Sequence, residues 1–203
     1  GFTDELNPLK FVDDRMVGGR GIPMTIAKNM KIPLVFYGES NFEYGSTKTL
    51  DIFHPLSDDE TKYIFMGAIY PYSIQDSLEQ ARLIGFKDLD DFNEWNRQGA
   101  VESYTQMDSI GYLCHQWCKY VKFGAQRTAD IASRLAREGA ITREHALKLI
   151  KERDFVCDPM AKRDFCKTLG ITEKYFDEIV EKHANLSIVK KDVDGVFKRK
   201  ELI

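Results

Sequence analysis

Cysteine is scarce in this chain, with four thiols among 203 residues, which is too sparse for a disulfide-rich scaffold. We therefore expect the thiols to be reduced. No apolar run reaches the roughly 20 residues that a membrane span requires. The first residues show neither the basic nor the apolar region of a secretory signal. These absences predict a cytoplasmic protein without a membrane span.

Sequence signatures of nucleotide binding and of hydrolysis are absent as well. Neither a G-x-x-x-x-G-K-[ST] phosphate loop nor a G-x-G-x-x-G turn that opens a βαβ unit occurs. His54, His145 and His183 stand alone, with no serine or cysteine nucleophile pattern nearby. The net charge of −3 gives no general attraction for nucleic acid or anionic membrane, so any anion site has to be local.

The chain does contain enough apolar residues, 43% of the total, to form a core. Residues 32–37 form a compact apolar run, which predicts a buried strand of a parallel sheet. Gly38, Glu39 and Ser40 follow it. Because ligands of open α/β sheets lie beyond the carboxyl ends of strands, these three residues are candidates for ligand binding. Residues 62–70 fit either a second strand or a buried helix.

From residue 73 onward, capping residues and glycines predict helices almost without interruption. The expected helices cover residues 73–84, 88–97, 103–121 and 125–138, and further helices are separated by glycine-to-threonine turns at 139–142 and 170–172. Asp158 and Pro159 are expected to open the helix between these turns. The predicted fold is therefore α/β over residues 1–72, followed by a mostly α domain over residues 73–203.

Positive charge is concentrated between residues 112 and 137. The basic residues there are Lys119, Lys122, Arg127, Arg134 and Arg137. The three arginines and Asp130 fall within about 80° of each other around a helix. Guanidinium groups donate bidentate hydrogen bonds to phosphate, so this basic cluster predicts a site for a phosphorylated substrate or pyrophosphate. A solvated helix face, with Asp130 paired to Arg127 or Arg134, explains the pattern equally well.

The cysteines and aromatic residues are more typical of a core than of a site. Cys114 and Cys118 are separated by three residues and Cys157 and Cys166 by eight, neither of which is a familiar zinc spacing. We therefore predict no metal site and expect buried thiols. The larger aromatic residues of the helical part are expected to supply core rings in preference to a sugar-stacking platform. These are Trp95, Tyr104, Tyr112, Trp117 and Tyr120.

Several short segments occur together in an order and spacing that resemble one family. The segments are DDFNEWNR at 90–97, DSIGY at 108–112, KYVKFG at 119–124, RTAD at 127–130, GAITRE at 139–144 and FDEIV at 176–180. The strand and turn at 32–40 are similar to a late sheet strand of that family. From about residue 22 to 190, the chain thus resembles the C-terminal part of N-acetyl sugar amidotransferases, in the PP-loop ATP pyrophosphatase superfamily.

The resemblance implies the C-terminal portion of a PP-loop sheet domain, of the adenine nucleotide alpha hydrolase type, followed by a helical domain. It also implies conversion of an acetamido group on a nucleotide-activated sugar to an acetamidino group, in lipopolysaccharide, O-antigen and flagellar sugar biosynthesis. ATP and Mg²⁺ would be the cofactors. Ammonia would come from partner subunits that resemble a glutaminase and a cyclase, and a homo-oligomer is compatible with this assembly.

Position and charge then assign roles to the candidate residues. Lys119, Lys122, Gly38, Glu39 and Ser40 are assigned to ATP or pyrophosphate, with Glu39 able to orient magnesium or the amide. The sugar nucleotide is assigned to the three arginines of the basic cluster, at 127, 134 and 137. The superfamily's Ser-Gly-Gly-x-Asp-Ser loop does not occur, and the chain starts at glycine. Either the chain is a truncated product, which the non-Met start favours, or this homologue has lost catalysis, and in both cases we expect that the 203 residues do not catalyse amidation alone.

A non-catalytic helical module that docks a partner protein is the alternative. Alanines at 125, 129, 132 and 136 form a stripe of small side chains, which allows another helix to approach closely. Affinity for pyrophosphate or a UDP-sugar would separate the two hypotheses, because a docking module has no need of it. Nucleic acid binding is not expected, since the locally basic segment sits in an acidic remainder.

Overall fold

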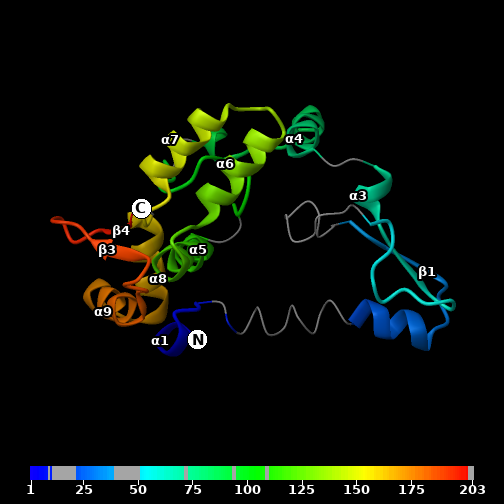
Figure 1. Cartoon of the computed structure of the whole chain (residues 1–203), viewed down its shortest axis with the longest axis horizontal. Helices are drawn as coiled ribbons and strands as arrows, with labels where there is room; N and C mark the ends of the chain where they lie inside the picture. Colours follow the sequence, from blue (N-terminus) through cyan, green and yellow to red (C-terminus); the bar gives the residue numbers. More distant parts are fainter. Residues whose placement is uncertain are drawn as a thin grey trace. The chain divides into compact units, whose positions relative to one another are not determined.

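The computed structural model describes residues 1–8, 10, 22–38, 51–70, 73–92, 95–107 and 110–200. It divides into two compact units, which are Phe11–Ile84 and the combination of Gly1–Lys10 with Gly85–Ile203 (Figure 1). The sequence suggested a division after residue 72. In the structure the helix after residue 72 belongs to the Phe11–Ile84 unit. Residues Gly1–Lys10 belong to the other unit, together with Gly85–Ile203.

The Phe11–Ile84 unit is built on a parallel pair of strands. Strand β1 (Leu34–Tyr37) pairs with β2 (Lys62–Phe65) in register from Leu34 opposite Lys62 to Tyr37 opposite Phe65. Strand β2 runs directly into the short helix α3 (Met66–Ile69), so the ambiguous segment 62–70 contains both structures. Residues 22–29 are helical, and α4 (Ile74–Leu83) starts at Ser73, whose hydroxyl accepts from the Asp76 N–H.

The parallel arrangement of β1 is confirmed, but its expected burial is wrong. Leu34 and Phe36 are 41% and 54% exposed, whereas the alternate residues Val35 and Tyr37 are half-buried. On the half-buried face, Tyr63 is fully buried and its hydroxyl lies 3.4 Å from the Met24 carbonyl of the helix at 22–29. A continuous apolar run does not reveal that only one face of this pair is covered by the described residues.

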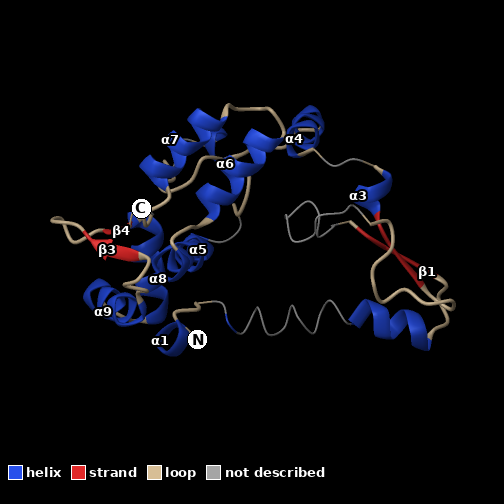
Figure 2. Ribbon diagram, in the orientation of Figure 1, coloured by secondary structure: helices blue, strands red, loops and turns tan. Residues whose placement is uncertain are grey.

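The other unit is mainly helical, with one small antiparallel hairpin (Figure 2). Its elements are α1 (Phe2–Glu5), η1 (Leu89–Asp91), α5 (Ile110–Phe123), α6 (Arg127–Arg137), α7 (Arg143–Arg153), α8 (Pro159–Leu169), α9 (Glu173–His183), β3 (Val189–Lys191) and β4 (Phe197–Arg199). Three predicted helix starts are confirmed, because Thr142, Asp158 and Thr172 each accept a hydrogen bond from the backbone N–H three residues later. No helix among the described residues is long and apolar enough to cross a membrane.

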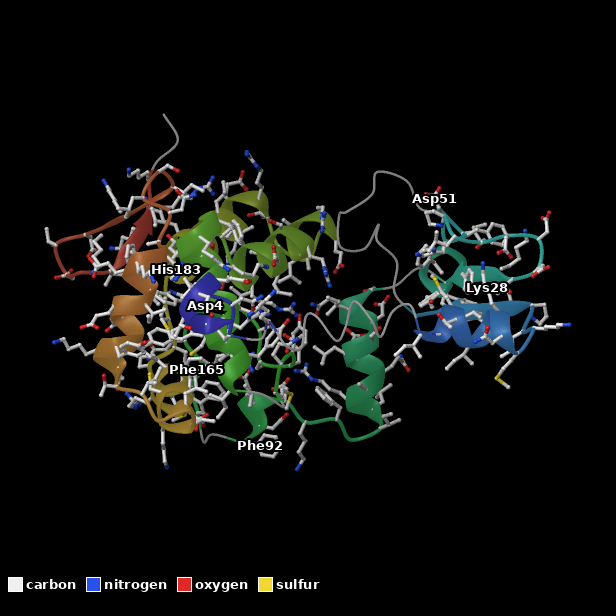
Figure 3. The ribbon with its side chains drawn as sticks, turned by 90° about the horizontal axis from the view of Figure 1, so that it is seen from below. Asp4, Lys28, Asp51, Phe92, Phe165 and His183 are labelled. Atoms are coloured by element: carbon white, nitrogen blue, oxygen red, sulfur yellow. The ribbon has the colours of Figure 1, made fainter. Side chains whose placement is uncertain are left out.

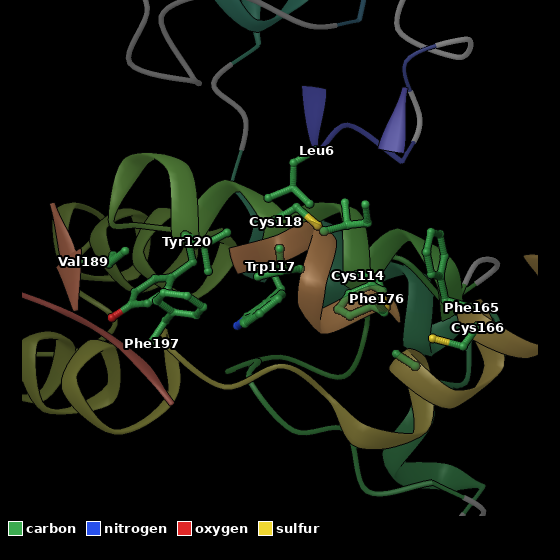
Figure 4. Close-up of a cluster of buried hydrophobic side chains, with 14 residues drawn as sticks. Leu6, Cys114, Trp117, Cys118, Tyr120, Phe165, Cys166, Phe176, Val189 and Phe197 are labelled. Atoms are coloured by element: carbon green, nitrogen blue, oxygen red, sulfur yellow. The ribbon is translucent and has the colours of Figure 1, made fainter. Parts of the chain in front are cut away.

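The core of this unit forms around α5, which packs against α8 and α9 (Figure 4). Phe176 is its central ring, stacked on Phe2 at 5.1 Å between ring centroids and on Trp117 at 6.2 Å. Short helix α1 reaches this core from the N-terminus, and the Thr3 carbonyl lies 2.8 Å from His183 Nε2 at the end of α9. Figure 3 shows this region, with Asp4 and His183 labelled.

The cysteines belong to this core and carry no disulfide. Burial raises the pKa of the Cys118 thiol, and a hydrogen bond with Cys114 together with burial raises that of Cys157. Both shifts favour the protonated thiol, so these groups are poor nucleophiles and poor metal ligands at neutral pH. Within the described ranges, no three His, Cys, Asp or Glu side chains gather in a way that would hold a metal ion.

Two predicted helices are wrong in their extent. Instead of a helix over 88–97, Asp88 and Asp91 form a reciprocal capping box that closes a single 3₁₀ turn, η1. Instead of starting near 103, α5 starts at Ile110. Residues 95–107 form a loop, because the Arg97 guanidinium binds the carbonyls of Thr105 and Gln106 and folds the segment back on itself. The hairpin of β3 and β4 was not predicted.

Candidate functional site

A cavity of about 260 Å³ opens at Gly38, at the carboxyl end of β1, where the sequence predicts a ligand. Its lining comes from the end of β1, from α3 and from the start of α4, and consists of Gly38, Met66, Gly67, Tyr70, Ser73, Asp76 and Ser77. A methyl group at Gly38 would meet no atom within 4 Å, so the backbone here is open to a ligand. Glu39 and Ser40, the other predicted residues, lie outside the described residues.

The electrostatics of this strand-end cavity are mixed. Helix α4 directs its N-terminus to the cavity, and a helix N-terminus carries partial positive charge. Asp76 in its first turn offsets that charge, and Ser73 already caps the helix. Asp76 therefore weakens the attraction of this helix N-terminus for an anion.

The basic cluster predicted on α5 and α6 is divided in the structure. Lys119 Nζ lies 3.7 Å from Asp130 Oδ2, which links the end of α5 to the first turn of α6. Both side chains are about half exposed, so this pair contributes little to stability and its ammonium remains accessible. The solvated-face hypothesis suggested that Asp130 pairs with Arg127 or Arg134. In the structure Asp130 pairs with Lys119 instead. Lys122 has a different neighbour, since its Nζ donates to the Glu5 carbonyl at 3.3 Å.

The three arginines of α6 differ in exposure. Arg137, in the last turn, is exposed, and Arg134 is partly buried. Arg127 points into the loop at 95–107, where its Nε lies 3.5 Å from Glu102 Oε1 and its Nη2 donates to Thr105 Oγ1 at 3.1 Å. Because the Glu102 side chain is only 2% exposed, Arg127 neutralises a buried carboxylate. Arg127 therefore has a structural partner that the helical periodicity did not reveal.

A buried polar network continues from Arg127 to the underside of this loop. Burial lowers the pKa of Arg97, while the nearby charges of Glu102 and Asp158 oppose that shift. Asp158 Oδ2 accepts from the Gln98 N–H at 2.7 Å, and its Oδ1 caps α8. Three buried atoms, Arg97 Nε, Glu102 Oε2 and Gln116 Oε1, have no hydrogen-bond partner in the described part of the chain.

The residues of that network line a small space of about 10 Å³, which has room for about one water molecule. One donor and two acceptors are the hydrogen-bonding complement of a single water. This space is too small for a substrate. The contacts of the network join the loop at 95–107 to α6 through Arg127 and to the start of α8 through Asp158.

Helix α6 is anchored at its start by a residue that sequence analysis did not identify. Asp154, 2% exposed at the end of α7, accepts from the backbone N–H of Gln126 at 3.2 Å and of Ala129 at 3.0 Å. Burial raises the pKa of Asp154 to about 6. The Gln126 side chain in turn donates to the Asp154 carbonyl at 2.6 Å. The helix that carries the basic residues is thus fixed to the end of its neighbour.

A comparison with known families decides the membership of this chain. Residues 91–200, more than half of the chain, match a family described as LPS biosynthesis protein WbpG-like, C-terminal domain. The chain belongs to this family. No curated protein matches it. Membership confirms the lipopolysaccharide part of the predicted role, and amidotransfer chemistry stays a prediction.

The WbpG-like match covers the loop at 95–107, helices α5 to α9 and the hairpin of β3 and β4. It includes Lys119, Lys122 and the three arginines of the basic cluster, and it does not reach the strand-end cavity at Gly38. Arg97 lies inside one of the segments that suggested the family. Its contacts give that segment a structural role, because the guanidinium closes the loop through two carbonyls.

Proposed function

We propose that this WbpG-like chain is part of an ATP-dependent amidotransferase of lipopolysaccharide biosynthesis. Its substrate would be a nucleotide-activated N-acetyl sugar, whose acetamido group becomes an acetamidino group with ammonia from a partner glutaminase. The observation that carries the proposal is the family match over residues 91–200, because it contains the basic helix α6 and the segments that resemble N-acetyl sugar amidotransferases.

The proposed reaction has two steps. The amide oxygen of the sugar attacks the α-phosphorus of ATP, and pyrophosphate leaves. Ammonia then adds to the amide carbon, and AMP departs with the former amide oxygen, which leaves the acetamidino group. The first step releases a highly charged pyrophosphate, so cationic side chains and Mg²⁺ lower its barrier by stabilising that charge as it develops.

The exposed cations of the basic cluster are the best suited to this task. Lys119 is accessible and loosely paired, and Arg137 is exposed at the end of α6. Arg127 is committed to Glu102, so its contribution would be to position the loop at 95–107. We therefore assign pyrophosphate or the sugar nucleotide to Lys119 on α5 and to Arg137 on α6, with Arg134 about one turn before Arg137 on the same helix.

Calorimetric titration of the 203-residue chain tests this assignment with ATP and Mg²⁺, with pyrophosphate and with UDP-N-acetylglucosamine. The double variant Lys119→Ala, Arg137→Ala should bind pyrophosphate at least about tenfold more weakly than the wild type, because it loses two charge-assisted contacts. The matched control Lys148→Ala, Lys151→Ala removes the same charge from α7 and should leave the affinity unchanged.

Absence of binding for all three ligands would instead support the alternative, a module that docks a partner protein. The alanine stripe gives that alternative no support by itself. Helix α7 packs against α6, and Ala132 and Ala146 are buried residues of the two helices. A small-residue surface on α6 is thus already used within the chain.

A further inference from the structure

A second cavity, of about 410 Å³, lies between α5, α8, α9 and the hairpin of β3 and β4. We call it the hairpin groove. Its volume lies within the roughly 300 to 1,000 Å³ of small-molecule sites. Its lining is Gln98, Trp117, Phe155, Val156, Cys157, Pro159, Lys162, Phe176, Asp177, Val180, Lys191, Gly195, Val196 and Phe197. The family match covers all of these residues, and neither the predicted site nor the proposed reaction uses any of them.

The floor of the hairpin groove is apolar and rigid. Its accessible apolar surface comes from Phe155, Val156 and Val196, which are half-buried, and from the exposed Pro159. Trp117, Phe176 and Phe197 also line the groove, but they are core residues less than 9% exposed, so they fix its shape and offer little surface to a ligand. Trp117 is further held by its indole N–H, which donates to the Phe155 carbonyl at 2.9 Å. The half-buried Phe155 leaves part of its side chain accessible. A ligand therefore has to present an apolar face to this floor.

The rim of the groove carries both signs of charge. Lys162 Nζ lies 2.7 Å from Asp177 Oδ1, and Lys191 Nζ lies 2.8 Å from Glu181 Oε2. Each ammonium also lies over a buried core ring, Lys162 at 5.4 Å from the Phe176 centroid and Lys191 at 5.3 Å from that of Phe197. Because every rim cation has a carboxylate neighbour, the rim presents balanced donors and acceptors and no net positive field.

Balanced charge excludes phosphate as the best ligand. A phosphate oxygen can only accept hydrogen bonds, so beside Asp177 it would meet like charge. A hydroxyl group both donates and accepts, and can therefore bridge an ammonium and a carboxylate at the same time. A ring with an apolar face and several hydroxyls at its edge matches the floor and the rim together.

We infer that the hairpin groove binds a neutral pyranose, with the C–H face of the ring on the apolar floor and its hydroxyls on Lys162 and Asp177. The inference rests on the proposed function for the identity of the sugar, an N-acetylhexosamine. The chemistry of the groove is argued from its own residues and does not depend on the proposed function. The groove would then hold the saccharide part of the substrate, or a neighbouring sugar of the same glycan.

Titration of the full chain with N-acetylglucosamine tests this inference, followed by ligand-observed NMR and by tryptophan fluorescence. Trp117 lines the groove, and Trp95 is the only other tryptophan of the chain. Asp177→Asn should weaken binding by about tenfold, because a hydrogen bond to a charged group is lost. The matched control is Glu178→Gln, at the next position of α9. Glu178 pairs with Lys174 on the surface, so this variant should bind the sugar like the wild type.

Lys162→Gln provides a second variant that should weaken the sugar in the same way, and circular dichroism checks the fold of each variant. No binding of N-acetylglucosamine, or equal binding by Asp177→Asn and Glu178→Gln, would overturn the inference. Displacement of the sugar by inorganic pyrophosphate would overturn it too, by showing an anion site. The double variant Lys119→Ala, Arg137→Ala distinguishes the two proposals, because it should lose pyrophosphate binding and still bind the sugar like the wild type.

Discussion

Gly99→Ala should lower the free energy of unfolding of the Gly1–Lys10 and Gly85–Ile203 unit by more than about 3 kcal/mol. Gly99 has φ +67°, and a β-carbon there would lie far inside van der Waals contact with the Val156 carbonyl oxygen and 3.2 Å from its carbonyl carbon. The clash is with backbone, so no side-chain rotation can relieve it. The loop at 95–107 must shift, and with it the 2.8 Å bond from Thr128 Oγ1 to the Gly99 carbonyl.

Gly139→Ala is the matched control for this substitution. Gly139 has φ +75°, close to that of Gly99, but a β-carbon there would meet no atom within 4 Å. Gly139→Ala should lower the free energy of unfolding only by the left-handed backbone penalty, about 1–2 kcal/mol. Urea unfolding followed by tryptophan fluorescence measures both variants, because both tryptophans lie in this unit. Equal destabilisation by the two variants would show that the close approach to Val156 does not matter.

Helix starts were predictable because their causes are local. Each predicted helix start has a side chain that accepts a hydrogen bond from the backbone N–H three positions later, at Ser73, Thr142, Asp158 and Thr172. Four consecutive residues are therefore enough to predict where such a helix begins. The hairpin had a local signal that the sequence analysis did not use, an Asp-Gly pair at 194–195. Asp192 Oδ1 accepts from two N–H groups of that turn, and Gly195 has φ +77°.

The loop at 95–107 could not be predicted in the same way, because distant residues fix it. Glu102 is joined to Arg127 across 25 positions, Gln98 to Asp158 across 60, and Ala100 to Arg153 across 53. Capping patterns in this segment favoured a helix, and these tertiary hydrogen bonds override that preference. Strand β1 shows the same limit, since its apolar run predicted two covered faces and the described residues cover one.

The candidate site shows how far charge counting reaches. Residues 112–137 were correctly located on two successive helices. Asp130 was expected to pair with Arg127 or Arg134 of its own helix, and in the structure it pairs with Lys119 of the other. Periodicity placed Arg127 in the same stripe as Arg134 and Arg137, but the structure commits Arg127 to a buried carboxylate. A sequence gives the position of a charge around a helix axis. Whether that charge is accessible to a ligand depends on the partner that tertiary folding supplies.

Asp154→Asn should raise the free energy of unfolding at pH 7.5 by about 1–3 kcal/mol and remove part of its pH dependence. The pKa of Asp154 is raised from 3.8 to about 6, mainly by burial. The folded state therefore holds this proton more tightly than the unfolded state does, and stability falls as pH rises from about 4 to about 6. Asparagine carries no charge to desolvate, and its amide oxygen can still accept from Gln126 and Ala129, because Oδ1 contacts both N–H groups.

Urea unfolding at pH 4.5 and pH 7.5 tests this expectation. The difference in stability between Asp154→Asn and the wild type should be small at pH 4.5, where Asp154 is mostly protonated in the folded state, and should favour the variant at pH 7.5. A difference that does not change with pH would show that Asp154 does not titrate in this range. Asp154→Ala also removes the titrating carboxyl, but it leaves two buried N–H groups without an acceptor, so it should be less stable than Asp154→Asn by about 2–4 kcal/mol at both pH values. The two variants together separate the cost of the buried charge from the benefit of the buried cap, because only the first depends on pH.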